Sequence, residues 1–416
     1  MNIKLGNLFK GDKVIWMVFF FLCAISIVEV FSASSNLTYR SQNYLGPISY
    51  HAVMIIIGTV VTIVTHHIPC RYFKLLTLFL LALSFLTLIW VLVGGESING
   101  ANRVISLWGF TFQPSEIAKG TMVLYTAQIL AATQRETGAD RKAFVYIMPI
   151  LLLIAFLIGI ENLSTAALLF AVIVLMMFIG RVPASQMLKL VGGGAILVIT
   201  FLILVMTLGS IENTGGSESQ MTETVSNVAS EEQGDKDAIK AGGIFHRFAT
   251  WRNRILKHFD KQEVPPEEYD IEDNFQVAHA NMAIASSGIT GKGPGNSTER
   301  DYLPQAFSDF IYAIIIEEMG LFGAVFVVFL YIVLLYRAAR IASRCENNFP
   351  AFLIMGLSLL LVIQATFNMM VAVGLAPVTG QPLPLISKGG TSTIINCAYI
   401  GAMLSVSRTA KVKSKA

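Results

Sequence analysis

Residues 307–340 read FSDFIYAIIIEEMGLFGAVFVVFLYIVLLYRAAR, a polar opening followed by a long apolar run that ends at arginines. The apolar part, from 310 to 336, exceeds the roughly 20 residues that an α-helix needs to cross about 30 Å of hydrocarbon. Its side chains do not alternate between apolar and polar as those of a β-barrel strand do. The stretch therefore predicts a transmembrane helix.

The composition extends this prediction to the whole chain. Of 416 residues, 54% are hydrophobic and 14% are charged, and the mean hydropathy is +0.63. Soluble domains carry about 25% charged residues, so most of this surface must face lipid. The composition excludes a cytosolic enzyme, a disordered hub and a secreted disulfide scaffold. A net charge of +3 gives no indication of a nucleic-acid partner.

Ten segments predict membrane-spanning helices, so the expected fold class is an all-α integral membrane protein. They lie at 14–34, 47–66, 73–93, 115–133, 144–161, 163–180, 187–208, 310–336, 350–374 and 390–407. We expect one membrane domain with transmembrane helices 1–7 in 1–209, one large extracytoplasmic loop at 210–309, and helices 8–10 with a cytoplasmic tail in 310–416.

Basic residues in alternate loops orient the chain, because cytoplasmic loops are enriched in Lys and Arg. If ten segments span, one side of the membrane carries the N-terminus, alternate loops and the tail, with Lys4, Lys10, Lys13, Arg71, Lys74, Arg135, Arg141, Lys142, Arg181, Lys189, Arg337, Arg340, Arg344, Arg408, Lys411, Lys413 and Lys415. The opposite short loops carry Arg40, Arg103 and Lys388. Both termini are therefore predicted to be cytoplasmic.

The outer segment 210–309 contains three different parts. Its first part, to about 240, is polar and favours a mobile chain. Residues 245–259 place aromatic and aliphatic side chains at helical spacing, with basic residues such as Arg247 between them. They predict a basic amphipathic helix, which either lies on the outer leaflet or packs across the bundle. Residues 291–296, GKGPGN, lack the Walker spacing and favour a turn over a phosphate cradle.

Three blocks of sequence resemble a known family. They are GANRVISLWGFTFQPSEIAK at 100–119, LPQAFSDFIYA at 303–313 and PVTGQPLPLISKGG at 377–390. In this order, and over nearly the whole chain, the sequence resembles the SEDS family (shape, elongation, division and sporulation). The resemblance implies ten spans and a peptidoglycan glycosyltransferase that polymerises lipid II at the outer face of the cytoplasmic membrane. The division branch (FtsW-like, at the septum) is favoured over the elongation branch (RodA-like).

The resemblance also implies partners and a catalytic residue. The partners are lipid II, the nascent glycan, a class B penicillin-binding protein (a transpeptidase) and membrane lipid, without nucleic acid. The catalytic aspartate of the family falls on Asp309. Several other family residues are replaced: Glu, His and Thr by Gln305, Phe307 and Ser308, Asp by Asn162, and Tyr by Lys388, while the block around Arg103 keeps only that arginine.

Asp309 is expected to act as a general base. It follows a polar loop and opens an apolar span, so it lies at the outer membrane surface beside a helix start. There it could take the proton from an incoming sugar hydroxyl, or it could serve as a helix cap. With a single carboxylate and an α-linked pyrophosphate donor, the expected reaction is one displacement with inversion.

The leaving pyrophosphate needs positive charge or hydrogen-bond donors nearby. The candidates are Arg103, Lys119, Lys388 and Arg247, with Ser387 and Thr379 as hydrogen-bonding side chains. For Lys119 the alternative is a helical ion pair with Glu116, three residues earlier. A divalent cation, Mg²⁺ or Mn²⁺, could bridge pyrophosphate and Asp309. The sequence implies no organic cofactor and shows no dedicated metal cage.

Acids inside the spans support further hypotheses. Glu317 is two turns beyond Asp309, so we expect it, with Glu116, to form part of a polar cavity wall. The alternative is pairing with another helix. Acids within spans would also suit a lipid II flippase or a proton-coupled transporter, although no inverted repeat is evident. A third possibility is a scaffold without activity that docks a transpeptidase.

Overall fold

The computed structural model describes residues 9–33, 46–94, 96–98, 101–107, 110–136, 138–190, 192–194, 200, 275–303 and 306–410. The chain divides into two compact units, and every element below belongs to the unit formed by Met1–Pro183 and Asp270–Ala416. The other unit, Ala184–Tyr269, lies almost entirely outside the described residues. Most of the expected seventh span, the amphipathic helix at 245–259 and the outer segment from 210 to 274 therefore lie outside the described residues.

Six described helices are long and apolar enough to span a membrane by length and composition. They are α1 (Lys13–Ala33), α3 (Gly46–His67), α4 (Cys70–Gly94), α6 (Arg141–Glu161), α11 (Ile311–Ala342) and α12 (Asn348–Ala372). Three more helices are shorter or more polar: α5 (Pro114–Thr133), α7 (Leu163–Ile179) and α13 (Thr391–Thr409). Within the described residues these nine helices coincide with nine of the ten expected spans. The protein is a mostly helical, multi-pass membrane protein, and the ten-span count stays a prediction.

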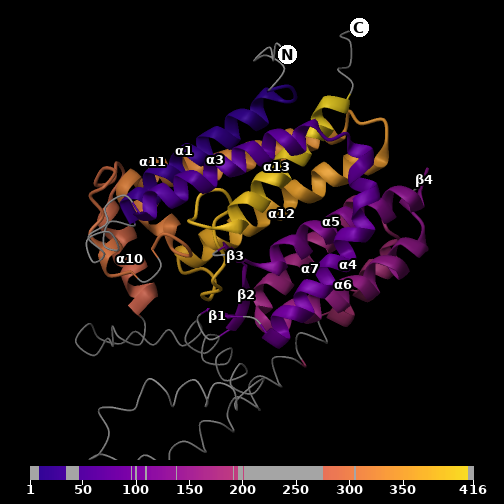
Figure 1. Ribbon diagram of the computed structural model, residues 1–416, viewed down its shortest axis with the longest axis horizontal. Coiled ribbons are helices and arrows are strands. Elements are labelled where there is room, and N and C mark those ends of the chain that lie inside the picture. Colours follow the sequence, from indigo (N-terminus) through magenta and orange to yellow (C-terminus); the bar gives the residue numbers. More distant parts are fainter. Residues whose placement is uncertain are drawn as a thin grey trace, which may run out of the picture. The chain divides into compact units, whose positions relative to one another are not determined.

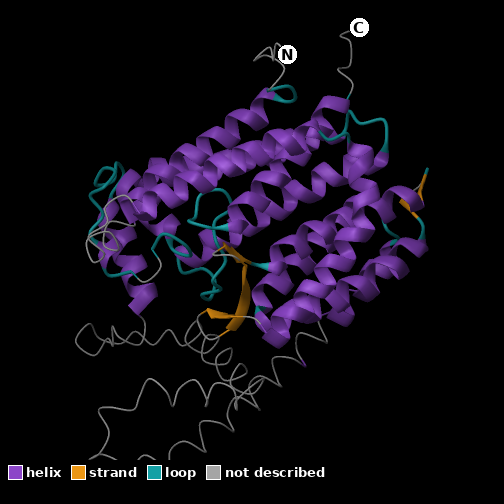
Figure 2. Cartoon of the chain, in the orientation of Figure 1, coloured by secondary structure: helices purple, strands orange, loops and turns teal. Residues whose placement is uncertain are grey.

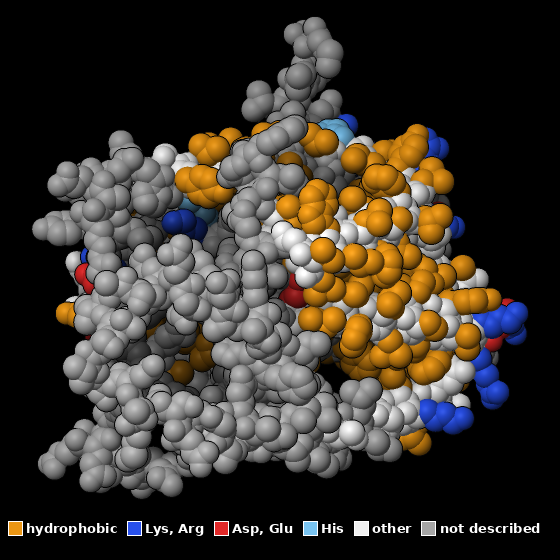
Figure 3. All heavy atoms as spheres, turned by 60° about the horizontal axis from the view of Figure 1, so that its bottom comes forward, with side chains coloured by type: hydrophobic (Ala, Val, Ile, Leu, Met, Phe, Trp, Pro, Cys, Tyr) orange, Lys and Arg blue, Asp and Glu red, His pale blue; other side chains and the backbone are white. Residues whose placement is uncertain are grey.

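α12 lies at the centre of the helix packing (Figure 1). It contacts α11 and α13 on one side and α5 and α7 on the other. Of the six apolar spans α12 is the most buried, at 61% of its window, whereas α4 is the least, at 22%. A helix that is apolar all round but little buried by protein must face lipid. Figure 3 shows a broad surface of hydrophobic side chains with Lys and Arg at its edge.

Short strands fill two of the loops, although the sequence predicts only helices (Figure 2). β1 (Glu96–Ile98), β2 (Ala101–Leu107) and β3 (Phe110–Phe112) form an antiparallel sheet between α4 and α5. β4 (Gln134–Arg135) and β5 (Gly138–Ala139) form a hairpin between α5 and α6. Pairing satisfies backbone groups that a loop beside the membrane would otherwise leave without partners.

α11 is broken near its start at Gly320, whose φ of 66° and ψ of −166° are not helical. Only glycine adopts this conformation readily. A Cβ atom on Gly320 would lie 2.3 Å from the carbonyl oxygen of Ile289, so the chain at 289–293 crosses the break at close range. The amides of Lys292 and Gly293 donate to the carbonyls of Glu317 and Glu318, at 2.9 and 2.8 Å. The glycine-rich turn GKGPGN is therefore docked into the kink of α11.

A helix precedes this docked segment and a short turn follows it. α10 (Phe275–Ser287) packs against α11 and leads into the turn. The 3₁₀ turn η2 (Glu299–Asp301) follows it and contacts α10 and α1. His279 of α10 binds Glu299 of η2, with Nδ1 and Oε2 2.6 Å apart. The path of the chain up to the start of α11 is thus held at several points.

Candidate active site

Asp309 lies in a turn at 306–310, one residue before Phe310, the N-cap of α11. Its side chain is half-buried, and the hydroxyl of Ser308 donates to its carboxylate Oδ1 at 3.0 Å. Asp309 therefore directly precedes the cap position of α11. A half-buried carboxylate at the membrane end of a helix has the access that a general base needs.

The loop between α12 and α13, residues 373–390, binds the backbone on both sides of Asp309. The amide of Lys388 donates to the Phe307 carbonyl at 2.8 Å, and the Ser387 hydroxyl donates to the Ser308 carbonyl at 2.6 Å. The carbonyl of Asp309 itself accepts from Asn368 Nδ2 of α12 at 2.8 Å. Three consecutive carbonyls are thus fixed by residues far away in the sequence.

Helix side chains hold this loop by its backbone carbonyls, because it has no regular hydrogen bonding of its own. The donor–acceptor pairs are Asn368 to Gln381 (2.7 Å), Gln364 to Pro382 (3.1 Å), Tyr331 to Pro384, and Ser26 to Ile386 (2.7 Å). The prolines give the loop a fixed backbone and cannot donate hydrogen bonds themselves. These contacts hold the loop at several points beside Asp309.

Asn162, where the family usually has Asp, caps α7. Its Oδ1 accepts from the amide of Thr165 at 3.2 Å. The hydroxyl oxygen of Thr165 accepts from Gln381 Nε2 at 2.6 Å. Since Asn368 bridges the carbonyls of Gln381 and Asp309, hydrogen bonds run from the α6–α7 junction to Asp309. An Asn keeps the oxygen that the cap needs, so the substitution preserves this link.

Two departures from the family pattern, Phe307 and Lys388, contact each other. The ammonium of Lys388 lies 4.6 Å from the centroid of the Phe307 ring, a cation–π geometry. Burial lowers the pKa of the Lys388 ammonium. The contact places a half-buried cation over the ring of Phe307, the residue two positions before Asp309. The role of Lys388 at a leaving phosphate stays a prediction.

Lys119 is in a different environment from the one predicted for a phosphate ligand. It is fully buried in α5, and its Nζ binds Glu116 Oε1 at 2.8 Å and Gln364 Oε1 at 2.7 Å. The helical ion pair, which the sequence left as the alternative, is therefore formed. An ammonium without solvent access cannot reach a substrate phosphate in this conformation. Glu116 likewise acts as the partner of Lys119 rather than as part of an open wall.

Glu317 also differs from the expectation of a cavity wall, and its neighbour Glu318 is engaged in the same way. The Glu317 carboxylate binds Lys292 Nζ at 2.6 Å and the amide and hydroxyl of Thr298 at 3.0 and 2.9 Å. The Glu318 carboxylate accepts from the amide of Gly295 at 2.9 Å and from the hydroxyl of Ser32. Donors of the glycine-rich turn, Lys292 Nζ and the Gly295 amide, thus bind these two carboxylates, because the turn is docked onto α11 at the kink at Gly320. They hold the segment that leads to Asp309.

The remaining predicted residues fall into three groups. Arg103 belongs to β2, but its side chain lies outside the described set, and Arg247 lies outside the described residues. Thr379 is buried, and its hydroxyl has no hydrogen-bond partner among the described residues. Ser387 uses its hydroxyl for the Ser308 carbonyl and the Leu383 amide, so its role is to hold the loop.

The sequence analysis did not identify the polar residues that hold the loop from within the spans. Ser26 of α1 donates to the Ile386 carbonyl, and His51 Nε2 of α3 lies 2.8 Å from the Ser26 hydroxyl. Because that hydroxyl has one proton and gives it to Ile386, His51 must donate through Nε2. The sequence did contain a signal for these residues. Isolated polar residues in apolar spans, such as Ser26 and His51, usually have a partner in the protein interior.

Comparison with known proteins gives the family. The family model for FtsW/RodA/SpoVE, described as cell cycle protein, matches residues 12–226 and 238–412. The protein named probable peptidoglycan glycosyltransferase FtsW from Geobacter sp. (strain M18) is 29% identical over 95% of this chain and 96% of its own length. The protein of the same name from Coxiella burnetii is 27% identical over 92% and 93%.

Solved structures show the same fold. A chain of a peptidoglycan synthase complex, described as coordinating polymerization and crosslinking, has a TM-score of 0.69 at 22% identity and covers 96% of this chain and 98% of that one. The rod shape determining protein RodA of Thermus thermophilus has a TM-score of 0.62 at 21% identity over 98% and 100%. On the match of the family model to nearly its whole length, this chain belongs to the FtsW/RodA/SpoVE family of cell cycle proteins.

Proposed function

We propose that this protein is a peptidoglycan glycosyltransferase that polymerises lipid II at the outer face of the cytoplasmic membrane. The observation that carries the proposal is the full-length similarity to proteins named probable peptidoglycan glycosyltransferase FtsW. The half-buried Asp309, whose carboxylate accepts from Ser308 and whose backbone is held by hydrogen bonds from two other segments, α12 and the loop between α12 and α13, supplies the group that the reaction requires. Glycosyl transfer needs a base on the acceptor and stabilisation of the leaving group.

In the proposed reaction, the acceptor is the GlcNAc 4-hydroxyl of an incoming lipid II. Its oxygen attacks the anomeric carbon of the growing glycan, and its proton passes to the carboxylate of Asp309. The bond between that carbon and the pyrophosphate oxygen breaks, and undecaprenyl pyrophosphate leaves. A single displacement converts the α-linkage of the donor into a β-linkage. No covalent glycosyl-enzyme forms, because the reaction uses one carboxylate.

Lys388 is the cation that we propose for the leaving pyrophosphate. Its amide donates to the carbonyl of Phe307, two residues before Asp309, and its ammonium is half-buried over the Phe307 ring. A cation in a partly dehydrated site interacts more strongly with developing negative charge than one in water. Mg²⁺ or Mn²⁺ stays part of the proposal with Asp309 as its protein carboxylate. Among the described residues, no three His, Cys, Asp or Glu side chains form a metal site, so such an ion would take its other ligands from phosphate and water.

We also propose a division role, with a class B penicillin-binding protein as the partner and the septum as the location. The names of the relatives support the division branch. The structural match to a chain of a peptidoglycan synthase complex supports a crosslinking partner. Cytoplasmic termini follow from the distribution of Lys and Arg over the loops.

The test is polymerisation of labelled lipid II by the purified full-length protein, with and without the cognate class B penicillin-binding protein. Asp309→Asn is expected to abolish glycan polymer while it keeps the unfolding midpoint of the wild type. Asp301→Asn, which changes an exposed acid in the same outer segment, is the matched control and is expected to keep activity. Polymer formation by Asp309→Asn would reject the assignment of the base. Transbilayer movement of lipid II without polymer would favour the flippase.

A further inference from the structure

A cavity of about 680 Å³ lies at the end of the helix bundle opposite Asp309. Asp309 precedes α11, whereas the cavity is formed where α11 ends and α12 begins, together with the first turn of α4 and the last turn of α5. This is the end that carries the described parts of both termini and that the basic loops predict to be cytoplasmic. The reaction proposed above does not use it.

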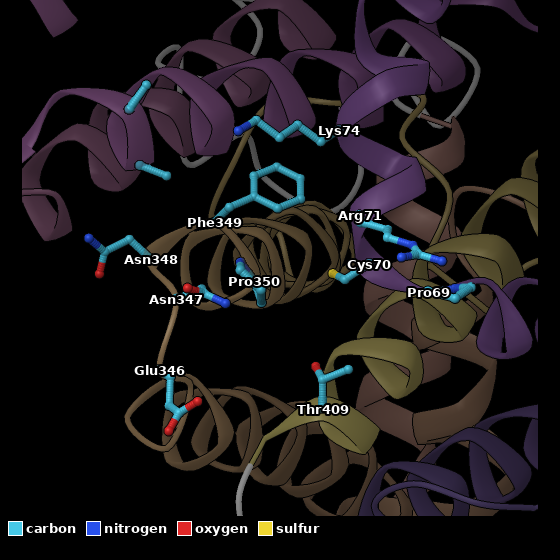
Figure 4. Close-up of a pocket in the computed structure, with 12 residues that line it drawn as sticks. Pro69, Cys70, Arg71, Lys74, Glu346, Asn347, Asn348, Phe349, Pro350 and Thr409 are labelled. Carbon is cyan, nitrogen blue, oxygen red and sulfur yellow. The ribbon is translucent and has the colours of Figure 1, made fainter.

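The cavity contains two cations and a helix start. Arg71 and Lys74 reach it from the first turns of α4, and Asn347 and Asn348 line it at the start of α12 (Figure 4). Asn347 is the N-cap of α12 but makes no capping hydrogen bond with its side chain. Backbone N–H groups at a helix start carry partial positive charge and bind anions. The cations and the helix start therefore favour an anionic group with several oxygen atoms.

Glu346 is the acid among the residues that line the cavity. It has an interaction partner within the protein, and the two cations, Arg71 and Lys74, outnumber this one acid in the lining. Arg71 is exposed; its guanidinium lies 5.0 Å from the centroid of the Tyr72 ring, and its Nη2 donates to the Tyr72 hydroxyl at 3.2 Å. Lys74 is exposed as well. The lining of the cavity thus carries one net positive charge, and both of its cations are exposed.

The same helix continues from these cations as a lipid-facing surface. Leu75 and Leu78 are 76% and 77% exposed, and Phe79 is 63% exposed. α4 is the least buried of the apolar spans. A ligand that fits both parts has an anionic headgroup and hydrocarbon chains. An anionic lipid therefore matches the site better than a soluble phosphate does. Basic pockets between transmembrane helices on the cytoplasmic side bind lipid headgroups in this way.

We propose that this cavity binds the phosphate headgroup of an anionic phospholipid of the adjacent leaflet. Arg71, Lys74 and the start of α12 hold the phosphate, and the acyl chains lie along Leu75, Leu78 and Phe79 of α4. The bound lipid joins the α11–α12 connection to the first turn of α4.

The experiment is a titration of the purified full-length protein in neutral detergent, followed by its thermal unfolding midpoint. The probes are short-chain phosphatidylglycerol, phosphatidylcholine of the same chain length, and inorganic phosphate. Phosphatidylglycerol is expected to raise the midpoint of the wild type, whereas the other two are not. Arg71→Gln/Lys74→Gln is expected to weaken the apparent affinity about 30-fold, since each basic residue near an anionic lipid contributes about a factor of five.

The matched control is Arg141→Gln/Lys142→Gln, which removes the same charge from exposed residues on the same membrane side that do not line the cavity. It is expected to bind phosphatidylglycerol as the wild type does. Ala131→Phe fills the cavity and leaves its charges unchanged, so it tests the proposal even if the charge variant fails to fold. Wild-type affinity in either cavity variant would overturn the proposal. Binding of inorganic phosphate as tight as that of phosphatidylglycerol would overturn the assignment to lipid.

Discussion

The hydroxyl of Ser387 donates a hydrogen bond of 2.6 Å to the backbone carbonyl of Ser308, the residue before Asp309. The same oxygen accepts a hydrogen bond of 2.7 Å from the amide of Leu383. One side chain thus closes its own loop and fastens that loop to the backbone of the proposed base. The position of the Asp309 carboxylate depends on a residue from another part of the chain.

Ser387→Ala is expected to lower the polymerisation rate about tenfold and the free energy of unfolding by about 1–3 kcal/mol. The reason is that a buried carbonyl and a buried amide lose their partner. Lipid II polymerisation and thermal unfolding in detergent measure the two effects. Ser358→Ala is the control, because among the described residues the Ser358 hydroxyl bonds to Met355 of its own helix. Equal losses of activity in both variants would show that Ser387 has no special role in placing Asp309.

The buried pair of Lys119 and Glu116 makes a prediction about folding. Lys119→Met leaves a buried carboxylate without its cation and is expected to cost about 3–5 kcal/mol of stability. Lys119→Met/Glu116→Gln removes both charges and is expected to recover much of that loss, because neighbouring residues do not contribute additively. Thermal unfolding of the single and double variants checks this.

The same double variant separates the two roles that the sequence allowed for Lys119. If the lysine acts only through its ion pair, the folded double variant keeps polymerase activity. A well-folded double variant without polymerase activity would instead assign Lys119 to the substrate, after a conformational change that exposes its ammonium.

Gly320→Ala is expected to prevent docking of the glycine-rich turn on α11. Its backbone conformation costs a non-glycine residue about 1–3 kcal/mol, and the added Cβ would also lie 2.3 Å from the Ile289 carbonyl oxygen. The expected result is loss of folded protein in detergent-solubilised membranes, measured by size-exclusion chromatography. Gly159→Ala is the control, since its Cβ would meet only Ala166 at an ordinary 3.6 Å. A well-folded Gly320→Ala protein would contradict the close approach at the kink.

Lys388 predicts a pH dependence of stability. Burial lowers its pKa in the folded state below the ordinary value of 10.5, so the unfolded chain holds the proton more tightly. Above pH 10.5 the Lys388 amine is neutral in both states, and its burial costs the folded state no charge. This part of the stability is lost as the pH falls through the lowered folded-state pKa, because the buried amine then becomes charged. The unfolding free energy of the wild type is therefore expected to rise with pH in this window relative to that of Lys388→Met.

Denaturant unfolding at several alkaline pH values measures this slope. Lys388→Met is also expected to polymerise lipid II more slowly while it unfolds cooperatively, because the proposed cation for the leaving group is gone. Parallel pH profiles of the two proteins would contradict the effect of burial. Unchanged polymerisation would reject the role of Lys388 in the reaction.

The sequence by itself determined the helical elements. Each span is recognisable from a continuous apolar run, so the expected 310–336 and 350–374 correspond to α11 and α12 within a few residues at most ends. α11 extends further, to Ala342, because nothing in residues 337–342 ends a helix. The blocks around Asp309 and at 377–390 also indicated the family before any contact was known.

Only the tertiary structure decided what the polar residues do. Lys119 and Glu317 read as candidates for a substrate cavity, but their partners are Gln364 on α12 and the turn at 292–298. The placement of Asp309 by Ser387 and Asn368 joins segments far apart in the sequence. The local composition of an apolar run is enough to predict that it lies in the membrane. The role of a polar side chain in a span depends on its hydrogen-bond partner, which is often distant in the sequence.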